Sequence, residues 1–162
     1  MSASLLADGA LPALSEMEFA LTVANNAFSR WMVRCMSAAG LSGLTPIEVL
    51  ILFSVSHRNR EKTLSDLCLV LNIEDTHLVT YGVKKLVSLD LVKAGKRGKE
   101  KTVQISDRGY AACKRYKEIR EELLVQSVKD LSLNPDEISK LASLLRALSG
   151  QYDQATRGAA SL

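Results

Sequence analysis

The sequence predicts a mainly α-helical protein with one small β-hairpin, an α+β fold, and three observations lead to it. Apolar residues recur every three or four positions along much of the 162-residue chain, which is the spacing of a helix buried on one face. At several points a serine, threonine or asparagine stands three residues before an acidic residue, a pattern that marks a helix start. Near the middle, two short β-forming runs flank a glycine-containing basic loop, which is typical of a hairpin.

A long first helix is expected from Ser15 to about Ala39. Ser15 and Glu18 have the spacing of a capping box, and Gly40 supplies a stop. The apolar residues of this segment step by three and four: Leu14, Met17, Leu21, Ala24, Phe28, Trp31 and Cys35. A stripe of this length must be buried against another helix, in the same chain or in a second copy.

The next helix is expected to lie at the centre of the core. Thr45, Pro46 and Glu48 provide a cap, a first-turn proline and a capping carboxylate. The segment from Ile47 to about His57 is nearly all apolar, and a helix that is apolar all round is buried on every side.

Two short helices follow, separated by a tight break. The first begins at Thr63 and ends near Asn72. The second is capped by Asp75 or Thr76 and runs to about Leu89. This pair has the pattern of a helix-turn-helix, whose second helix enters the DNA major groove. By helical spacing, the outward side chains of the second helix are Thr76, His77, Thr80, Tyr81, Lys84, Lys85 and Ser88. Hydroxyls, an imidazole and a phenol suit base edges, and the lysines suit phosphates.

A basic hairpin and two more helices complete the expected order. Residues 91–94 and 102–105 form the strands, and the loop between them carries Lys96, Arg97, Lys99 and Lys101. The segment Ser106-Asp107-Arg108-Gly109 then opens a long helix from Tyr110 to about Leu131, and Asn134 caps the last one. The last helix has its own apolar stripe: Ile138, Leu141, Leu145, Leu148 and Tyr152.

The basic charge is concentrated in one segment. Residues 84–117 hold eleven basic and three acidic residues, a net charge of +8, whereas the rest of the chain has a net charge of −5. The near-neutral total of +3 therefore hides a strongly basic region. Such a region is either a solvated surface or the footprint of a polyanion such as DNA.

The order of these elements is that of a winged helix-turn-helix, and from Ser15 to Tyr152 the sequence resembles the MarR family of bacterial transcriptional regulators. Four pieces carry the resemblance: Leu44-Thr45-Pro46, Thr80-Tyr81-Gly82-Val83-Lys84-Lys85-Leu86, Leu91-Val92, and Val103-Gln104-Ile105-Ser106-Asp107-Arg108-Gly109. The last piece stands where the family has a strand followed by Leu-Thr-x-x-Gly.

The resemblance implies a homodimeric regulator that binds a pseudo-palindromic operator in double-stranded DNA, with half-sites about 34 Å apart. The recognition helix would enter the major groove, and the basic wing would reach the flanking backbone or minor groove. The expected DNA-binding residues are Thr76, His77, Thr80, Tyr81, Lys84, Lys85, Lys96, Arg97, Lys99 and Lys101. The expected dimerisation residues are Leu14, Met17, Leu21, Phe28, Leu141, Leu145, Leu148 and Tyr152. A small-molecule effector would be a further partner.

The expected organisation is a single MarR-like domain over residues 15–155, between a flexible N-terminus (1–14) and a flexible tail (156–162). Within the domain, residues 45–106 form the DNA-binding lobe. The dimerisation region combines residues 15–40 and 107–155.

Two departures from the family keep a second hypothesis open. The wing tip reads Arg97-Gly98-Lys99 where the family commonly has Asp-Arg-Arg, so no acid at the tip orients an arginine. Tyr81 stands where the family tends to have arginine, and a phenol lacks the bidentate fork of a guanidinium. The alternative is a winged-helix protein-interaction module that lacks sequence-specific DNA binding.

Other classes of function are not expected. Nothing resembles an activated nucleophile, paired carboxylates or a phosphate-binding glycine loop, and the His and Cys spacings suit no metal site, so we expect no catalysis, cofactor or metal. We find no signal peptide and no apolar run of roughly 18 residues, and we expect a cytoplasmic protein. Some MarR-family relatives sense oxidants through a cysteine in the first helix, so Cys35 leaves a redox-sensing regulator as a third hypothesis.

Overall fold

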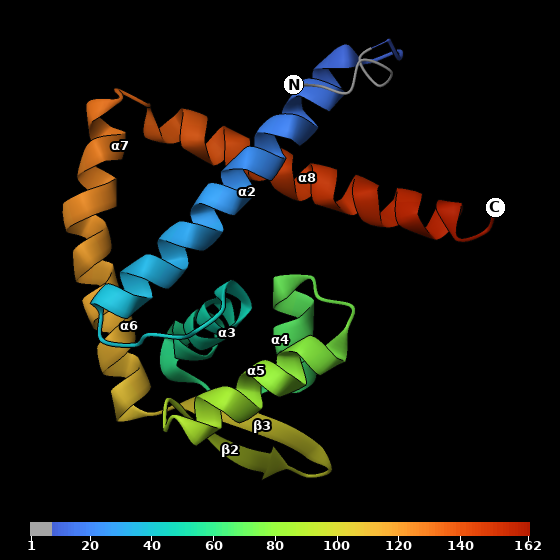
Figure 1. The fold of residues 1–162 in the computed structure, drawn as a ribbon. Helices are drawn as coiled ribbons and strands as arrows, with labels where there is room; N and C mark the ends of the chain where they lie inside the picture. Colours follow the sequence, from blue (N-terminus) through green and yellow to red (C-terminus); the bar gives the residue numbers. More distant parts are fainter. Residues whose placement is uncertain (1–7) are drawn as a thin grey trace. The chain divides into compact units, whose positions relative to one another are not determined.

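The computed structural model describes residues 8–162 and divides into two compact units, the first ending at Arg120 and the second running from Glu121 to Leu162. Figure 1 traces the order of the elements. The first unit contains α2 (Pro12–Ala38), α3 (Pro46–Ser56), a 3₁₀ turn η1 (His57–Asn59), β1 (Lys62–Thr63), α4 (Leu64–Leu71), α5 (Thr76–Ser88), β2 (Val92–Arg97), β3 (Glu100–Ile105) and α6 (Asp107–Arg120). The second contains the π-helical segment η2 (Glu121–Val125), α7 (Gln126–Asp130) and α8 (Pro135–Ala159).

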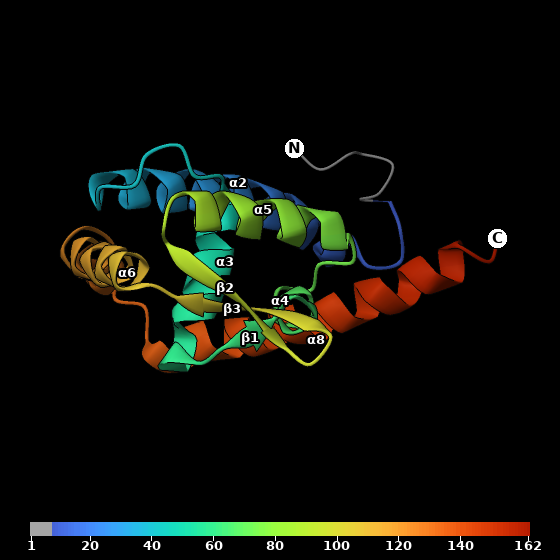
Figure 2. The same ribbon diagram turned by 90° about the horizontal axis from the view of Figure 1, so that it is seen from below.

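The predicted fold class, mainly helical with a small β-wing, is confirmed, and one strand was missed. The three strands form an antiparallel sheet in the order β1-β3-β2, with β3 in the middle (Figure 2). The hairpin was expected, but β1 was not: Lys62 pairs with Val103 and Thr63 with Thr102. A strand of two residues carries no periodicity of its own, so the sequence shows it only as part of a charged loop.

Three of the predicted helix starts have the expected capping boxes. The side chains of Thr45 and Thr63 each accept the backbone N–H of the third helical residue, and the side chain of Asn134 accepts that of the second. In all three boxes, the cap residue donates its own backbone N–H to the carboxylate of the third helical residue. At Thr63, for example, the backbone N–H donates to the Asp66 carboxylate at 2.9 Å, and the Asp66 N–H donates to the Thr63 hydroxyl at 3.0 Å. Local side-chain chemistry therefore determines where α3, α4 and α8 begin.

The expected start of the first helix and the expected end of the last one are wrong. Helix α2 begins at Pro12 instead of Ser15, because proline at the first helical position needs no side-chain cap to start a helix. Helix α8 continues to Ala159, so residues 156–159 are helical and not part of a flexible tail. The expectation for residues 1–7 lies outside the described residues.

The core of the first unit forms around α3, as its apolar sequence predicts. Val49, Ile51, Leu52 and Val55 have no exposed surface, and α3 packs against α2, α4, α5, α6 and β3. The expected stripe of α2 is buried only at its C-terminal end, where Met32, Cys35 and Met36 enter this core. The remainder of the stripe faces outward or is half-buried.

The residues assigned to dimerisation are partly or fully exposed. Leu14, Met17, Leu145 and Leu148 are half-buried, whereas Leu21, Phe28, Leu141 and Tyr152 are exposed. None of residues 135–159, which make up α8, is buried. Among the described residues, no helix combines the length and the apolar character needed to cross a membrane.

Candidate nucleic-acid interface

Helix α5 is held against the core by one face. Val79, Gly82, Val83 and Leu86 are buried, and a Cβ atom on Gly82 would lie 2.6 Å from Cδ1 of Ile51. The glycine therefore lets α5 approach α3 closely. The opposite face, which carries the predicted recognition residues, is left toward solvent.

The predicted recognition residues do not all face outward to the same degree. Thr76, His77, Tyr81 and Lys84 are exposed, whereas Thr80 is half-buried. The Thr80 hydroxyl donates to the backbone carbonyl of Thr76 at 2.9 Å. Its proton therefore has a partner within the helix, and its oxygen lone pairs and methyl group remain for a neighbour.

Lys85 has partners inside the protein. Its ammonium donates to Oε2 of Glu48 at 2.9 Å and to the carbonyl of Gly43 at 2.7 Å. The same Glu48 oxygen accepts the backbone N–H of Thr45 at 2.8 Å. Lys85 thus ties the last turn of α5 to the start of α3, a role that its outward position in the sequence pattern did not indicate.

Lys84 and Tyr81 form a pair on the outward face. The Lys84 ammonium lies over the Tyr81 ring, 5.7 Å from its centroid, which is within the range of a cation–π contact. The Tyr81 side chain is 70% exposed. A large aromatic ring with a cation against its face therefore dominates this part of the helix surface.

The wing carries its basic residues at an exposed tip. Lys96, Arg97, Lys99 and Lys101 are all exposed. The strands pair from Val92 with Ile105 to Arg97 with Glu100, which leaves a turn of Gly98 and Lys99. Gly98 has φ +62°, a conformation that glycine adopts without strain.

Arg97 has acidic neighbours that the wing sequence did not reveal. Glu100 is its cross-strand partner. The pKa of Asp66, at the start of α4, is held below its ordinary value mainly by hydrogen bonding with Thr63, and the charge of Arg97 lowers it further. Acidic groups near Arg97 thus come from the opposite strand and from α4 instead of from an aspartate at the tip.

A hydrogen-bonded junction joins the end of α5, the wing and α6. The Ser106 hydroxyl donates to the carbonyl of Asp90 at 2.6 Å and accepts the N–H of Gly109 at 3.0 Å. Arg108 donates to the carbonyl of Leu89 at 2.6 Å. We call residues 89–91 together with 106–109 the α5–α6 junction. Within this junction Ser106 caps the start of α6, Arg108 anchors it to Leu89, and Gly109 allows the backbone of Leu91 to approach closely.

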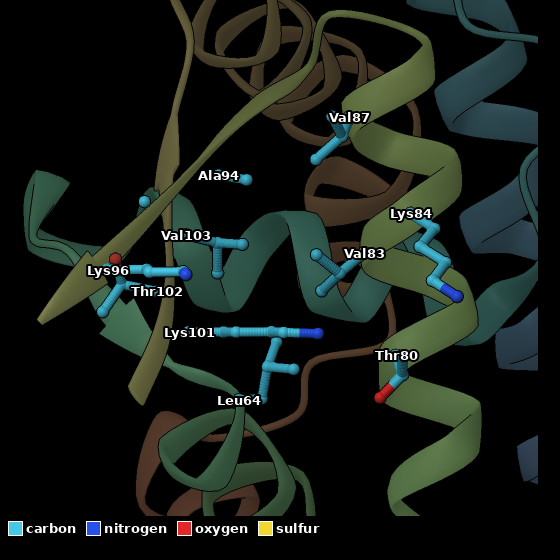
Figure 3. Close-up of a pocket in the computed structure, with 11 residues that line it drawn as sticks. Leu64, Thr80, Val83, Lys84, Val87, Ala94, Lys96, Lys101, Thr102 and Val103 are labelled. Carbon is cyan, nitrogen blue, oxygen red and sulfur yellow. The ribbon is translucent and has the colours of Figure 1, made fainter. Parts of the chain in front are cut away.

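A cavity of about 510 Å³ lies between α5 and the wing (Figure 3). Its walls are largely apolar, and lysines from both elements stand around it: Leu64, Thr80, Val83, Lys84, Val87, Ala94, Gly95, Lys96, Lys101, Thr102 and Val103. Lys101 extends from β3 toward α5 (Figure 3). Because Lys84, Lys96 and Lys101 line one cavity, α5 and the wing present positive charge to the same region.

Cys35 lies in an environment that disfavours its thiolate. The side chain is buried, and its Sγ donates to the carbonyl of Tyr116 at 3.6 Å. Burial raises the pKa of the thiol, and the charge of Arg120 opposes this only in part. Since the thiolate is the form that reacts with oxidants, these surroundings do not favour the redox-sensing hypothesis. Within residues 8–162, no group of three or more His, Cys, Asp and Glu side chains could hold a metal ion.

Known proteins similar to the chain share its fold. A sequence profile described as a winged helix DNA-binding domain matches residues 44–109. A cysteine-to-serine variant of E. coli MarR complexed with operator DNA has a TM-score of 0.68 at 19% identity, covering 87% of this chain and 99% of that one. Reduced AbfR bound to DNA has a TM-score of 0.72 at 15% identity, covering 88% and 96%. No curated protein sequence matches the chain.

A third similar structure is that of Staphylococcus aureus MarR in complex with salicylate and kanamycin. Its TM-score is 0.67 at 13% identity, and the match covers 88% of this chain and 94% of that one. At these identities the likeness is one of fold.

Proposed function

We propose that this chain, whose winged helix-turn-helix fold is that of the MarR-family regulators, is a homodimeric DNA-binding transcriptional regulator. The observation that carries the proposal is the shared basic surface of α5 and the wing, where lysines of both elements surround one cavity. Two elements that offer positive charge to one side are suited to a groove and its flanking phosphates. Such a regulator would act in the bacterial cytoplasm, where the DNA lies, and would need no catalytic group.

In this proposal α5 enters the major groove through Thr76, His77, Thr80, Tyr81 and Lys84. The wing residues Lys96, Arg97, Lys99 and Lys101 contact the flanking backbone or the minor groove. Lys85 keeps its bonds to Glu48 and Gly43 and sets the position of α5 without contacting a phosphate itself.

The wing charge can be tested by reversal. Lys99→Glu is expected to weaken the binding of all DNA sequences alike, because a residue at the turn meets phosphates and not base edges. The measurement is an electrophoretic mobility shift with fragments from beside the gene and with unrelated fragments. Lys114→Glu, on α6, is the matched control, because it makes the same charge change away from the wing.

The same experiment separates the two functional hypotheses. A regulator retains its own operator far better than unrelated DNA. A protein-interaction module would retain every fragment weakly and equally, and that result would contradict the proposal.

A second copy of the chain is proposed to cover the apolar surfaces of α2 and α8. Helix α8 is 25 residues long and has no buried residue. Its large apolar side chains Ile138, Leu141 and Leu144 are therefore exposed in the single chain. A helix with an apolar face gains most of its stability from packing that face against another surface. A pseudo-palindromic operator requires two recognition helices. A homodimer would both cover the apolar faces and supply the second recognition helix.

Leu141→Glu is expected to convert the dimer to a monomer, because it places a charge in the proposed interface. Light scattering would measure the mass, and the mobility shift would show a loss of operator binding. Ser143→Glu, on the opposite side of α8, should leave the dimer intact. A wild-type protein that is monomeric at micromolar concentration would contradict the dimer.

A small-molecule effector also belongs to the proposal. The cavity between α5 and the wing falls within the usual volume of ligand pockets. A bound molecule there would touch both DNA-contacting elements.

A further inference from the structure

The outward face of α5 lacks the side chains that read adenine. Asparagine and glutamine make the bidentate bonds to adenine, and arginine or lysine makes those to guanine. Residues 76–88 contain no arginine, asparagine or glutamine. Of the two lysines in this segment, Lys85 is bonded to Glu48 and Gly43.

Two of the hydroxyl donors on this face form hydrogen bonds within the helix. The Thr80 hydroxyl donates to the Thr76 carbonyl at 2.9 Å, and the Ser88 hydroxyl donates to the Lys85 carbonyl at 2.7 Å. The protons of these two hydroxyls are therefore not directed toward the DNA. Side chains other than Thr80 and Ser88 must supply most of the base discrimination.

The largest outward group is the ring of Tyr81, which is 70% exposed. The Lys84 ammonium over one face of the ring restricts its orientation. A ring buried in the major groove needs an apolar partner, and the largest apolar group that base edges offer there is the C5 methyl group of thymine. The chemistry of this surface therefore favours thymine.

We infer that the Tyr81 ring packs on a thymine methyl group, so that each operator half-site carries a thymine at one fixed position. The inference rests on the proposed DNA-binding function and specifies the sequence that α5 recognises. Lys84, held beside the ring, then lies near acceptor atoms of the same or the next base pair. Thr80 lines the cavity at the wing side of the helix (Figure 3).

The test replaces thymine by deoxyuridine, which lacks only the methyl group. The full-length protein first selects its preferred duplex from a random pool, and each thymine of that duplex is then replaced in turn. At one symmetric pair of positions, deoxyuridine is expected to weaken wild-type binding about fourfold per half-site, the effect of one buried methyl group. Other positions should respond less.

Variants of the protein assign the effect to the ring. Tyr81→Ala should bind the thymine and deoxyuridine duplexes equally, whereas Tyr81→Phe, which keeps the ring, should retain the difference. His77→Ala, on the same exposed face, should weaken the binding of both duplexes by the same factor and so retain the difference. Because these side chains are exposed, the variants are expected to fold, and circular dichroism would verify this.

Three results would overturn the inference while leaving the proposed function intact. The first is that the wild type binds the thymine and deoxyuridine duplexes equally at every position. The second is that Tyr81→Ala still prefers the thymine duplex. The third is that Tyr81→Phe loses that preference. Failure of the protein to enrich any sequence would instead contradict the proposed function itself.

Discussion

Raising the salt concentration from 50 to 200 mM is expected to weaken operator binding by about 10³–10⁵-fold, if the dimer contacts roughly 6–10 phosphates. Each phosphate that a lysine or arginine neutralises releases condensed counterions, and added salt opposes that release. The basic residues exposed on α5 and the wing are numerous enough for this: Lys84, Lys93, Lys96, Arg97, Lys99 and Lys101 in each protomer.

Fluorescence anisotropy at several salt concentrations would give the slope of log affinity against log salt. Lys99→Glu should make this slope less steep by about two, because each of the two protomers loses about one phosphate contact. Tyr81→Ala should leave the slope unchanged, since its ring contacts no phosphate. A slope near zero for the wild type would contradict an electrostatic interface on the wing.

Gly109→Ala is expected to destabilise the protein by about 2–3 kcal/mol, the upper part of the range for overpacked sites. An added Cβ atom would lie 2.1 Å from the carbonyl oxygen of Leu91 and 2.9 Å from Cδ1 of Ile105. The first of these atoms belongs to the backbone and cannot rotate away. The higher helix propensity of alanine, about 1 kcal/mol, offsets only part of the cost.

Thermal unfolding would measure this effect, with a fall in Tm of about 4–12 °C for a chain of this size. Gly150→Ala is the matched control, because it is also a helical glycine and no atom lies within 4 Å of its added Cβ. That variant should unfold at the same or a higher temperature. Equal Tm values for the two variants would mean that the α5–α6 junction can open without cost.

The sequence predicted those parts of the fold that depend on local chemistry. Capping boxes located the starts of α3, α4 and α8, and the apolar run 47–57 located the core helix. The first helix is instructive because Ser15 and Glu18 have the spacing of a capping box, yet the helix begins at Pro12. A capping pattern permits a start, and a favourable residue before it can extend the helix.

The candidate site was less predictable because its details depend on residues far apart in the chain. Lys85 has the position of a DNA-contacting residue, but its partner Glu48 lies 37 residues away. The charge of Arg97 acts on Asp66, which belongs to a different element. The sequence of the wing tip alone therefore did not reveal the electrostatic surroundings of that arginine. Neither relation follows from spacing within a single helix or hairpin.

The α5–α6 junction has a consequence for the DNA. Hydrogen bonds from Ser106 and Arg108 fasten the start of α6 to the residues that follow α5, and the wing ends at the same place. The distance between the major-groove contact of α5 and the flanking contact of the wing is therefore fixed within each protomer. An operator is expected to accept no inserted base pair inside a half-site, and whatever variation in length it tolerates must fall between the two halves.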